Sequence, residues 1–317
     1  MAVDFDPKLV EQLACLKRNV AKVFFGRPEV VDQLIVGLLA GGHVLVEDVP
    51  GVGKTILART LAKSIHCTFA RIQLTPDLLP SDILGVSIYN EQTRNFEFKK
   101  GPIFANIVLA DEVNRTTPRT QSAMLEAMNE GQISIDGHTF TLEKPFMVIA
   151  TQNPFEFEGT YILPENQLDR FILRITIGYP SPEQEARIIL ERPARAAMTD
   201  LQPVLNSDEV IALQKIVDQV HISKEVMDYT LHFIHATRNH KHLDLGLSPR
   251  GGQALIRAAQ ARSLIEKRDF VIPEDIKYLA VPVCAHRVLS KSYIDESHSS
   301  STSSIITQII NDISVPV

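Results

Sequence analysis

HVLVEDVPGVGKT, at residues 43–55, is the most informative stretch of this chain. It begins with the apolar run His43–Glu47, passes through a short segment with two glycines, and ends at Lys54 and Thr55, where a helical pattern starts. A buried strand, a glycine-containing loop and a helix N-terminus in this order are typical of a phosphate-binding loop (P-loop). The glycines let backbone N–H groups point at phosphate oxygens, and the helix N-terminus adds the positive end of its dipole.

The side chains of this loop suit a nucleoside triphosphate with its metal ion. Lys54 is placed to reach the β- and γ-phosphates, and Thr55 is placed to coordinate Mg²⁺. We expect nucleotide contacts from seven consecutive residues: Pro50, Gly51, Val52, Gly53, Lys54, Thr55 and Ile56. One position departs from the usual pattern, because Asp48 stands where such a loop carries its first glycine.

Strands and helices alternate around this loop, which is typical of a parallel sheet with helices on both faces. Apolar runs predict strands at 43–47, 69–74, 107–110, 145–150 and 171–177. Helical patterns are found at 9–23, 30–38, 55–65 and 122–129. Two hairpins, at 88–98 and 133–142, interrupt the alternation. The fold class is thus α/β, a P-loop NTPase αβα sandwich with a parallel sheet.

The composition changes near Tyr179, where the sequence reads YPSP. Beyond this point the pattern is helical, with Ser207 and Ser223 as candidate N-caps and with helices starting near Pro249 and Pro273. We expect a core nucleotide-binding domain at 1–179 and a smaller, all-helical lid domain at 180–317. The serine-rich stretch 297–304 is expected to be a loop.

Polar residues follow two further strands of the predicted sheet. Asp111 and Glu112 end the apolar run IVLA, and Asn153 follows the run at 145–150. After a P-loop, a carboxylate at a strand tip is suited to hold Mg²⁺, which we assign to Asp111. Glu112 is suited to act as general base toward the attacking water, and Asn153 to orient that water by hydrogen bonding.

Two arginines are candidates for the neutralisation of charge during phosphoryl transfer. Arg170 precedes the last strand and is well suited to reach across a subunit boundary, although an ion pair with the adjacent Asp169 is an alternative. Arg250 lies in the first turn of a predicted helix, where a cation opposes the helix dipole. A functional anion partner would explain that placement.

The amino-acid composition limits the classes of protein to which this chain can belong. The 317 residues are 44% apolar and 22% charged, which indicates a globular chain of more than one domain. A net charge of -6 argues against a chain-wide nucleic-acid surface. The three cysteines have no paired spacing, and neither a signal peptide nor an apolar run of about 20 residues is present, so we expect a cytoplasmic protein without membrane insertion.

The order of these motifs resembles the AAA+ superfamily and, within it, the MoxR-like ATPases. The matching motifs are GVGKT at 51–55 (Walker A), DEVNR at 111–115 (Walker B), ATQNP at 150–154 (sensor 1), LDRF at 168–171 (arginine finger) and SPR at 248–250 (sensor 2). The resemblance implies an ATP hydrolase that uses Mg²⁺ and forms a homo-oligomer, a hexameric ring with ATP held between subunits. It also implies chaperone-like remodelling of a protein client, a partner with a von Willebrand factor A domain, and hairpins that face a central pore or the client.

Three other functions are compatible with the same motifs. A magnesium-chelatase-type motor would use ATP to drive metal insertion. A nucleic-acid motor, such as an MCM-like helicase, shares both hairpins, but the acidic balance weighs against it. A nucleotide-gated scaffold that binds ATP without turnover draws slight support from Asp48, while Glu112 and Arg170 argue against it.

Overall fold

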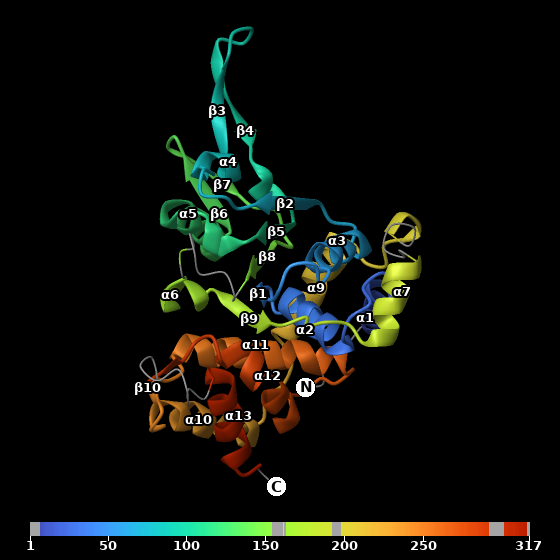
Figure 1. The fold of residues 1–317 in the computed structure, drawn as a ribbon, viewed down its shortest axis with the longest axis vertical. Helices are drawn as coiled ribbons and strands as arrows, with labels where there is room; N and C mark the ends of the chain where they lie inside the picture. The colour runs from blue at the N-terminus through green and yellow to red at the C-terminus, as the bar shows by residue number, and fades with distance from the viewer. Residues whose placement is uncertain (1–6, 154–160, 162, 192–197, 292–300, 316–317) are drawn as a thin grey trace.

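A computed structural model describes residues 7–153, 161, 163–191, 198–291 and 301–315 (Figure 1). A five-stranded parallel sheet forms the centre of the core, in the order β2-β5-β8-β1-β9. Its strands are β1 (His43–Glu47), β2 (Phe69–Gln73), β5 (Ile107–Asp111), β8 (Met147–Gln152) and β9 (Phe171–Ile175). The predicted αβα architecture is confirmed. The apolar runs form strands because β1, β5 and β8 are buried along nearly their whole length.

Helices cover the sheet on both faces. The core helices are α1 (Pro7–Ala21), α2 (Pro28–Leu39), α3 (Lys54–Ser64), α4 (Pro80–Leu84), α5 (Pro118–Glu130) and α6 (Glu165–Leu168), with short 3₁₀ turns η1 (Pro102–Phe104) and η2 (Val113–Arg115). The helix predicted at 122–129 begins earlier, since the Thr117 side chain accepts a hydrogen bond from the backbone N–H of Thr120 and Pro118 occupies the first helical position.

Both predicted hairpins are present and pack against each other. They are β3 (Gly85–Asn90) with β4 (Asn95–Lys100), and β6 (Gln132–Ile135) with β7 (His138–Thr141). Phe98 of β4 stacks on Phe140 of β7 with ring centroids 4.3 Å apart, and the Ser87 hydroxyl donates to Asp136 at 2.6 Å. The β3–β4 hairpin extends beyond this contact and forms the projection at the top of Figure 1.

Most of the helical part that follows the sheet, from α10 to α13, lies below the sheet in Figure 1. Its elements are α7 (Pro182–Glu191), α9 (Ser207–Val217), α10 (Lys224–Arg238), α11 (Pro249–Ile265), α12 (Pro273–Cys284) and α13 (Thr302–Asp312). A short antiparallel pair, β10 (Leu243–Leu245) with β11 (Leu289–Ser290), makes this lid not entirely helical. Among these elements α7 lies beside α1 and α3 of the core, where the Arg187 guanidinium stacks over the Phe25 ring at 4.7 Å.

Two predictions on the lid are wrong in detail. Asn206, not Ser207, is the N-cap of α9, because its side chain accepts from the backbone N–H of Glu209 while Glu209 bonds back to the N–H of Asn206. The predicted loop at 297–304 lies partly outside the described residues, and its end begins α13 with Ser301 as N-cap. The other predicted cap, Ser223, is confirmed, and α11 starts at Pro249 as predicted, with Ser248 as its N-cap.

His43 ties three core elements together at the start of β1. Its Nε2 lies 2.9 Å from the carbonyl oxygen of Met128 in α5, and its Nδ1 accepts from the backbone N–H of Val148 in β8 at 3.0 Å. Burial lowers the pKa of His43 to about 4. Protonation would remove the acceptor for Val148, so the neutral ring is part of the folded structure.

The free energy of unfolding should therefore fall on acidification. The pKa of His43 moves from 6.5 to about 4 on folding, so its contribution is complete above about pH 6.5 and is lost as the pH falls toward 4. Between pH 7 and pH 5 the loss should be about 2 kcal/mol. Urea denaturation of the wild type and of His43→Gln at both pH values checks this. A difference between the two proteins that does not change with pH would contradict it.

Candidate active site

The loop between β1 and α3 has the backbone of a phosphate-binding loop. Gly51 and Gly53 have positive φ angles of 88° and 94°, a region that other residues adopt only with strain. The space around Gly51 is open, so a ligand can approach the backbone there. Lys54 opens α3, and its ammonium donates to the carbonyl oxygen of Asp48 at 2.6 Å.

The structure explains why Asp48 replaces the usual glycine. Its carboxylate is buried and accepts hydrogen bonds from the backbone N–H groups of Val49, at 2.8 Å, and of Gly178, at 2.6 Å. Gly178 follows β9 and has a φ of 71°. Asp48 is thus a tether between the P-loop and the segment that leads out of the sheet.

The acidic pair at the end of β5 is held by Thr151 of β8. The Thr151 hydroxyl donates to Asp111 Oδ1 at 2.6 Å and accepts from the backbone N–H of Glu112 at 2.9 Å. The other Asp111 oxygen pairs with Arg71 of β2 at 2.7 Å. These partners could not be predicted from the sequence, because Thr151 and Arg71 approach Asp111 only through strand pairing.

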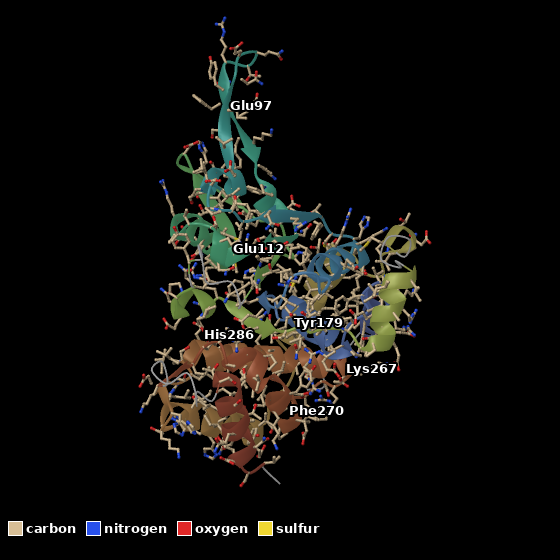
Figure 2. All side chains as sticks on the ribbon, in the orientation of Figure 1. Glu97, Glu112, Tyr179, Lys267, Phe270 and His286 are labelled. Carbon is tan, nitrogen blue, oxygen red and sulfur yellow. The ribbon has the colours of Figure 1, made fainter. Side chains whose placement is uncertain are left out.

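Glu112 adopts a left-handed backbone conformation with a φ of 61°, which turns the chain out of β5. Its side chain, labelled in Figure 2, is partly exposed and accepts from Gln73 Nε2 at 2.8 Å. Arg115 lies 3.4 Å from the same carboxylate oxygen. Asn153 follows β8 and is buried, whereas Pro154 lies outside the described residues.

Because all these strands are parallel, their carboxyl ends meet at one edge of the sheet. Lys54, Thr55, Asp111, Glu112 and Asn153 all follow or end such strands. Ligand sites in parallel α/β sheets lie at this edge. The structure therefore brings together five of the seven residues predicted for catalysis or metal binding.

An apolar cavity of about 1130 Å³ adjoins the loop. Five of the seven residues expected to contact nucleotide line it: Gly51, Val52, Gly53, Thr55 and Ile56. Phe24 and Phe25, in the loop between α1 and α2, line it together with Ile177 and Gly178. An apolar cavity beside a phosphate-binding loop suits a base and a sugar. Sequence reasoning missed Phe24 and Phe25, although two aromatic residues in a loop before Gly26 were a visible signal.

Arg170 lies at the opposite edge of the sheet. Phe171, the next residue, pairs with His43 at the start of β1, whereas the P-loop follows the end of β1. The five residues of β1 separate the two edges by about 16 Å. In Figure 1, α6 lies to the left of the sheet, on the side away from α3. Arg170 therefore does not share an edge with the P-loop of its own chain.

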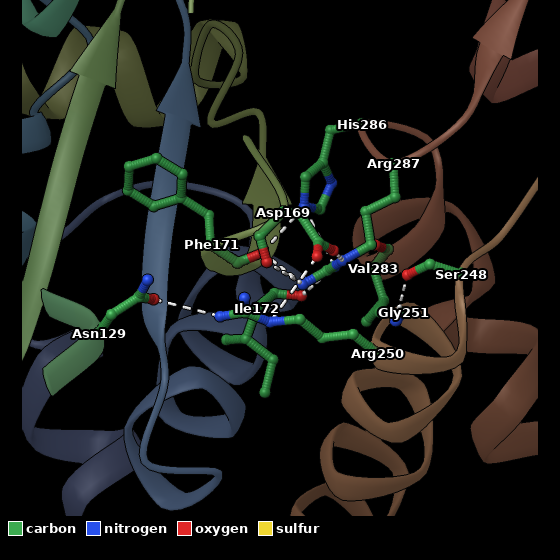
Figure 3. Close-up of polar contacts among 10 residues, drawn as sticks. All are labelled: Asn129, Asp169, Phe171, Ile172, Ser248, Arg250, Gly251, Val283, His286 and Arg287. Atoms are coloured by element: carbon green, nitrogen blue, oxygen red, sulfur yellow. Dashed lines mark hydrogen bonds and ion pairs between the residues drawn. The ribbon is translucent and has the colours of Figure 1, made fainter. Parts of the chain in front are cut away.

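Arg250 lies near Arg170. Its Nη2 donates to Asn129, in the last turn of α5, at 3.1 Å, and its Nε lies 3.6 Å from Asp169 Oδ2 (Figure 3). Arg250 thus pairs with Asp169 of the same chain, and its role toward a functional anion stays a prediction. The alternative ion pair between Asp169 and Arg170 is not formed, because the carboxylate faces Arg250 and the buried Arg287.

Comparisons with known proteins agree with this arrangement. A family model described as ATPase family associated with various cellular activities (AAA) matches residues 43–173, and one described as AAA lid domain matches residues 235–309. YeaC of Bacillus subtilis is 48% identical over 299 residues, which cover 94% of this chain and 93% of that protein. Chaperone MoxR1 of Mycobacterium tuberculosis is 39% identical over 309 residues, 94% of this chain and 81% of that protein. The crystal structure of a protein from Cytophaga hutchinsonii superposes on this chain with a TM-score of 0.90. The two are 38% identical, and the superposition covers 98% of this chain and 96% of that one.

Replacement of Asp48 tests its role as a tether. Asp48→Ala leaves two backbone N–H groups without their charged acceptor, so the free energy of unfolding should fall by about 2–3 kcal/mol. Nucleotide should still bind, since the glycines of the loop are unchanged. Chemical denaturation and a fluorescent-nucleotide titration measure the two effects. Unchanged stability, or loss of binding without loss of stability, would show that Asp48 has another role.

Proposed function

This chain belongs to the MoxR family of AAA+ ATPases and hydrolyses ATP, and we propose that it uses hydrolysis for chaperone-like remodelling or maturation of protein complexes. The observation that carries the mechanism is the split of the candidate residues between two edges of one parallel sheet. We divide the chain for this purpose into a core at 1–179 and a lid at 180–317.

The nucleotide-binding edge supplies one half of a complete site. The backbone of residues 50–56 wraps the phosphates, and Lys54 binds the β- and γ-phosphate oxygens. Phe24 and Phe25 provide apolar walls for the base. Thr55 and Asp111 would hold Mg²⁺, which supplies charge neutralisation on the β- and γ-phosphate oxygens when bound. Both residues offer oxygen, the donor that Mg²⁺ prefers, and Thr151 fixes one Asp111 oxygen.

Glu112 is the proposed general base. It accepts a proton from a water whose oxygen attacks the γ-phosphorus, while the bond from that phosphorus to the bridging oxygen breaks and ADP leaves. Asn153 orients the water by hydrogen bonding. To face the water, Glu112 must give up its contacts with Gln73 and Arg115.

Arg170 and Arg250 are proposed to complete the site of a neighbouring subunit. Both side chains belong to the edge opposite the P-loop, so a head-to-tail contact between copies brings the two edges together. A closed ring repeats that contact at every boundary, and we propose a homo-hexamer. Positive charge from the neighbour would neutralise the transferring phosphoryl group.

The client and partner are proposed from the family and from the name of a relative. MoxR1 of Mycobacterium tuberculosis carries the name chaperone. A protein client, a partner with a von Willebrand factor A domain and a cytoplasmic location fit that role. The net charge of -6 gives no support to a nucleic-acid substrate. None of the described helices has both the length and the hydrophobicity of a transmembrane span.

Replacement of the general base should separate binding from hydrolysis. Glu112→Gln should retain ATP affinity but lower kcat by about 100-fold or more, since a positioned base contributes about that factor. Glu126→Gln, at an exposed position on α5, is the matched control and should keep wild-type activity. Affinity capture with ATP-loaded Glu112→Gln then identifies bound clients. Wild-type turnover in Glu112→Gln would remove the proposed base.

A shared site should also make activity depend on concentration. Dilution separates subunits and removes the neighbour's arginines, so phosphate release per subunit should fall as the ring dissociates. Steady-state phosphate release, measured beside sedimentation velocity at the same concentrations, checks this. Specific activity that stays constant while the ring dissociates would place the complete site within one chain.

A further inference from the structure

Arg287 follows α12 in the lid, but its side chain is buried against the start of β9 in the core (Figure 3). Only 3% of the side chain is exposed, whereas the Asp169 side chain that it binds is 22% exposed. A buried arginine is costly unless its charge and its donors are all satisfied.

Each of the five N–H donors of the Arg287 guanidinium has an acceptor. They are Asp169 Oδ1 at 2.8 Å from Nε, the carbonyl oxygens of Asp169 at 3.2 Å and Phe171 at 2.8 Å from Nη2, and the carbonyl oxygens of Ile172 at 3.1 Å and Val283 from Nη1. Four of these acceptors belong to the turn and strand start that carry Arg170. The guanidinium thus binds backbone carbonyl groups on both sides of Arg170.

Asp169 and His286 form further contacts between the lid and this turn. Asp169 lies between the buried Arg287 on one carboxylate oxygen and the exposed Arg250 on the other. His286 Nε2 lies 2.9 Å from the carbonyl oxygen of Phe171. Lid side chains therefore bind Asp169 on one side of Arg170, and Phe171 and Ile172 on the other, through carboxylate or backbone atoms.

The contacts of the Arg170 side chain differ from those of the residues around it. Within the part of the chain that the structure describes, it forms no hydrogen bond or ion pair, and its backbone N–H donates to the carbonyl oxygen of Gln167 at 3.2 Å. An ion pair that only joined lid to core would not need to bind the peptide groups around this one arginine. Binding of those peptide groups fixes the position of the Arg170 backbone, while the Arg170 guanidinium remains available for the neighbouring site.

We propose that Arg287 is a positioning residue that fixes the turn carrying Arg170, so that the lid of each subunit sets the reach of its own arginine toward the neighbouring site. The proposal rests on the proposed role of Arg170 in the neighbour's site. Val283 belongs to α12 and Arg287 follows it, so both residues move with the lid. A shift of the lid therefore also moves the turn that Arg287 binds. A misplacement of about 1 Å in a catalytic group can cost about 100-fold in rate.

Arg287→Lys tests the proposal because it keeps the charge but loses the fork that binds several carbonyl groups. We expect kcat for ATP hydrolysis to fall by about 10- to 100-fold, with ATP affinity at its own P-loop unchanged. Arg268→Lys is the matched control. Arg268 binds both oxygens of the buried Asp275 at 2.8 and 2.9 Å within the lid. It should lower the Tm without lowering kcat.

Mixed rings distinguish positioning from a general loss of structure. Arg287→Lys subunits keep a working P-loop edge, and Glu112→Gln subunits keep a working Arg170. Mixing these two slow variants should raise activity toward about a quarter of the wild-type value, since about a quarter of head-to-tail contacts join the two intact halves. Mixing Arg287→Lys with Arg170→Ala should give no such rise, because both variants are defective on the same edge.

The opposite pattern would overturn the proposal. Recovery with Arg170→Ala and none with Glu112→Gln would place the effect of Arg287 at its own nucleotide. Wild-type kcat in folded Arg287→Lys would remove the residue from catalysis. If Arg287→Lys fails to fold, Asp169→Asn takes its place, with the same expected pattern.

One control separates this proposal from the proposed function. Glu112→Gln mixed with Arg170→Ala should recover activity if Arg170 acts in the neighbour's site. If that mixture recovers no activity, both the shared site and the positioning role of Arg287 are refuted. Recovery in that mixture, without recovery of Arg287→Lys by Glu112→Gln, refutes only the positioning role.

Discussion

The parallel pairing of β1 with β9 is the constraint on which the rest of the site depends. Pairing of His43 with Phe171 fixes the P-loop at one edge of the sheet and Arg170 at the other. Strand length then keeps them about 16 Å apart. No side-chain rotation closes such a distance, so the residues typical of phosphoryl transfer form two half-sites. We propose that assembly of copies joins the two halves.

Strand β9 is held at both of its ends. Beyond its carboxyl end, Gly178 donates to the buried carboxylate of Asp48 in the P-loop. At its amino end, Arg287 binds the carbonyl oxygens of Phe171 and Ile172. The strand thereby connects the loop that binds one nucleotide with the turn proposed to reach the next. We propose this connection as a physical route by which neighbouring sites affect each other, with the lid bound at the amino end.

The sequence predicted those parts of the fold that depend on local pattern. The strands, the P-loop, the acidic pair and both hairpins were recognised because apolar runs, glycines and turn residues lie close together in the chain. The N-cap of α9 was placed one residue late, since Asn206 and Ser207 are both good caps and only the reciprocal bond with Glu209 decides between them. Partners such as Thr151 for Asp111 and Arg287 for Asp169 lie 40 and 118 residues away and follow only from tertiary packing. The roles assigned to individual site residues remain predictions.

The shared site is tested most directly by a structure of the assembled protein with ADP, Mg²⁺ and aluminium fluoride, which imitates the transferring phosphoryl group. The account predicts that Arg170 of one subunit donates to the fluoride ligands at the neighbour's P-loop, at about 3 Å, while its Asp169 stays bound to Arg287. An Arg170 that remains in solvent, or a subunit whose own side chains fully enclose the fluoride, would contradict it.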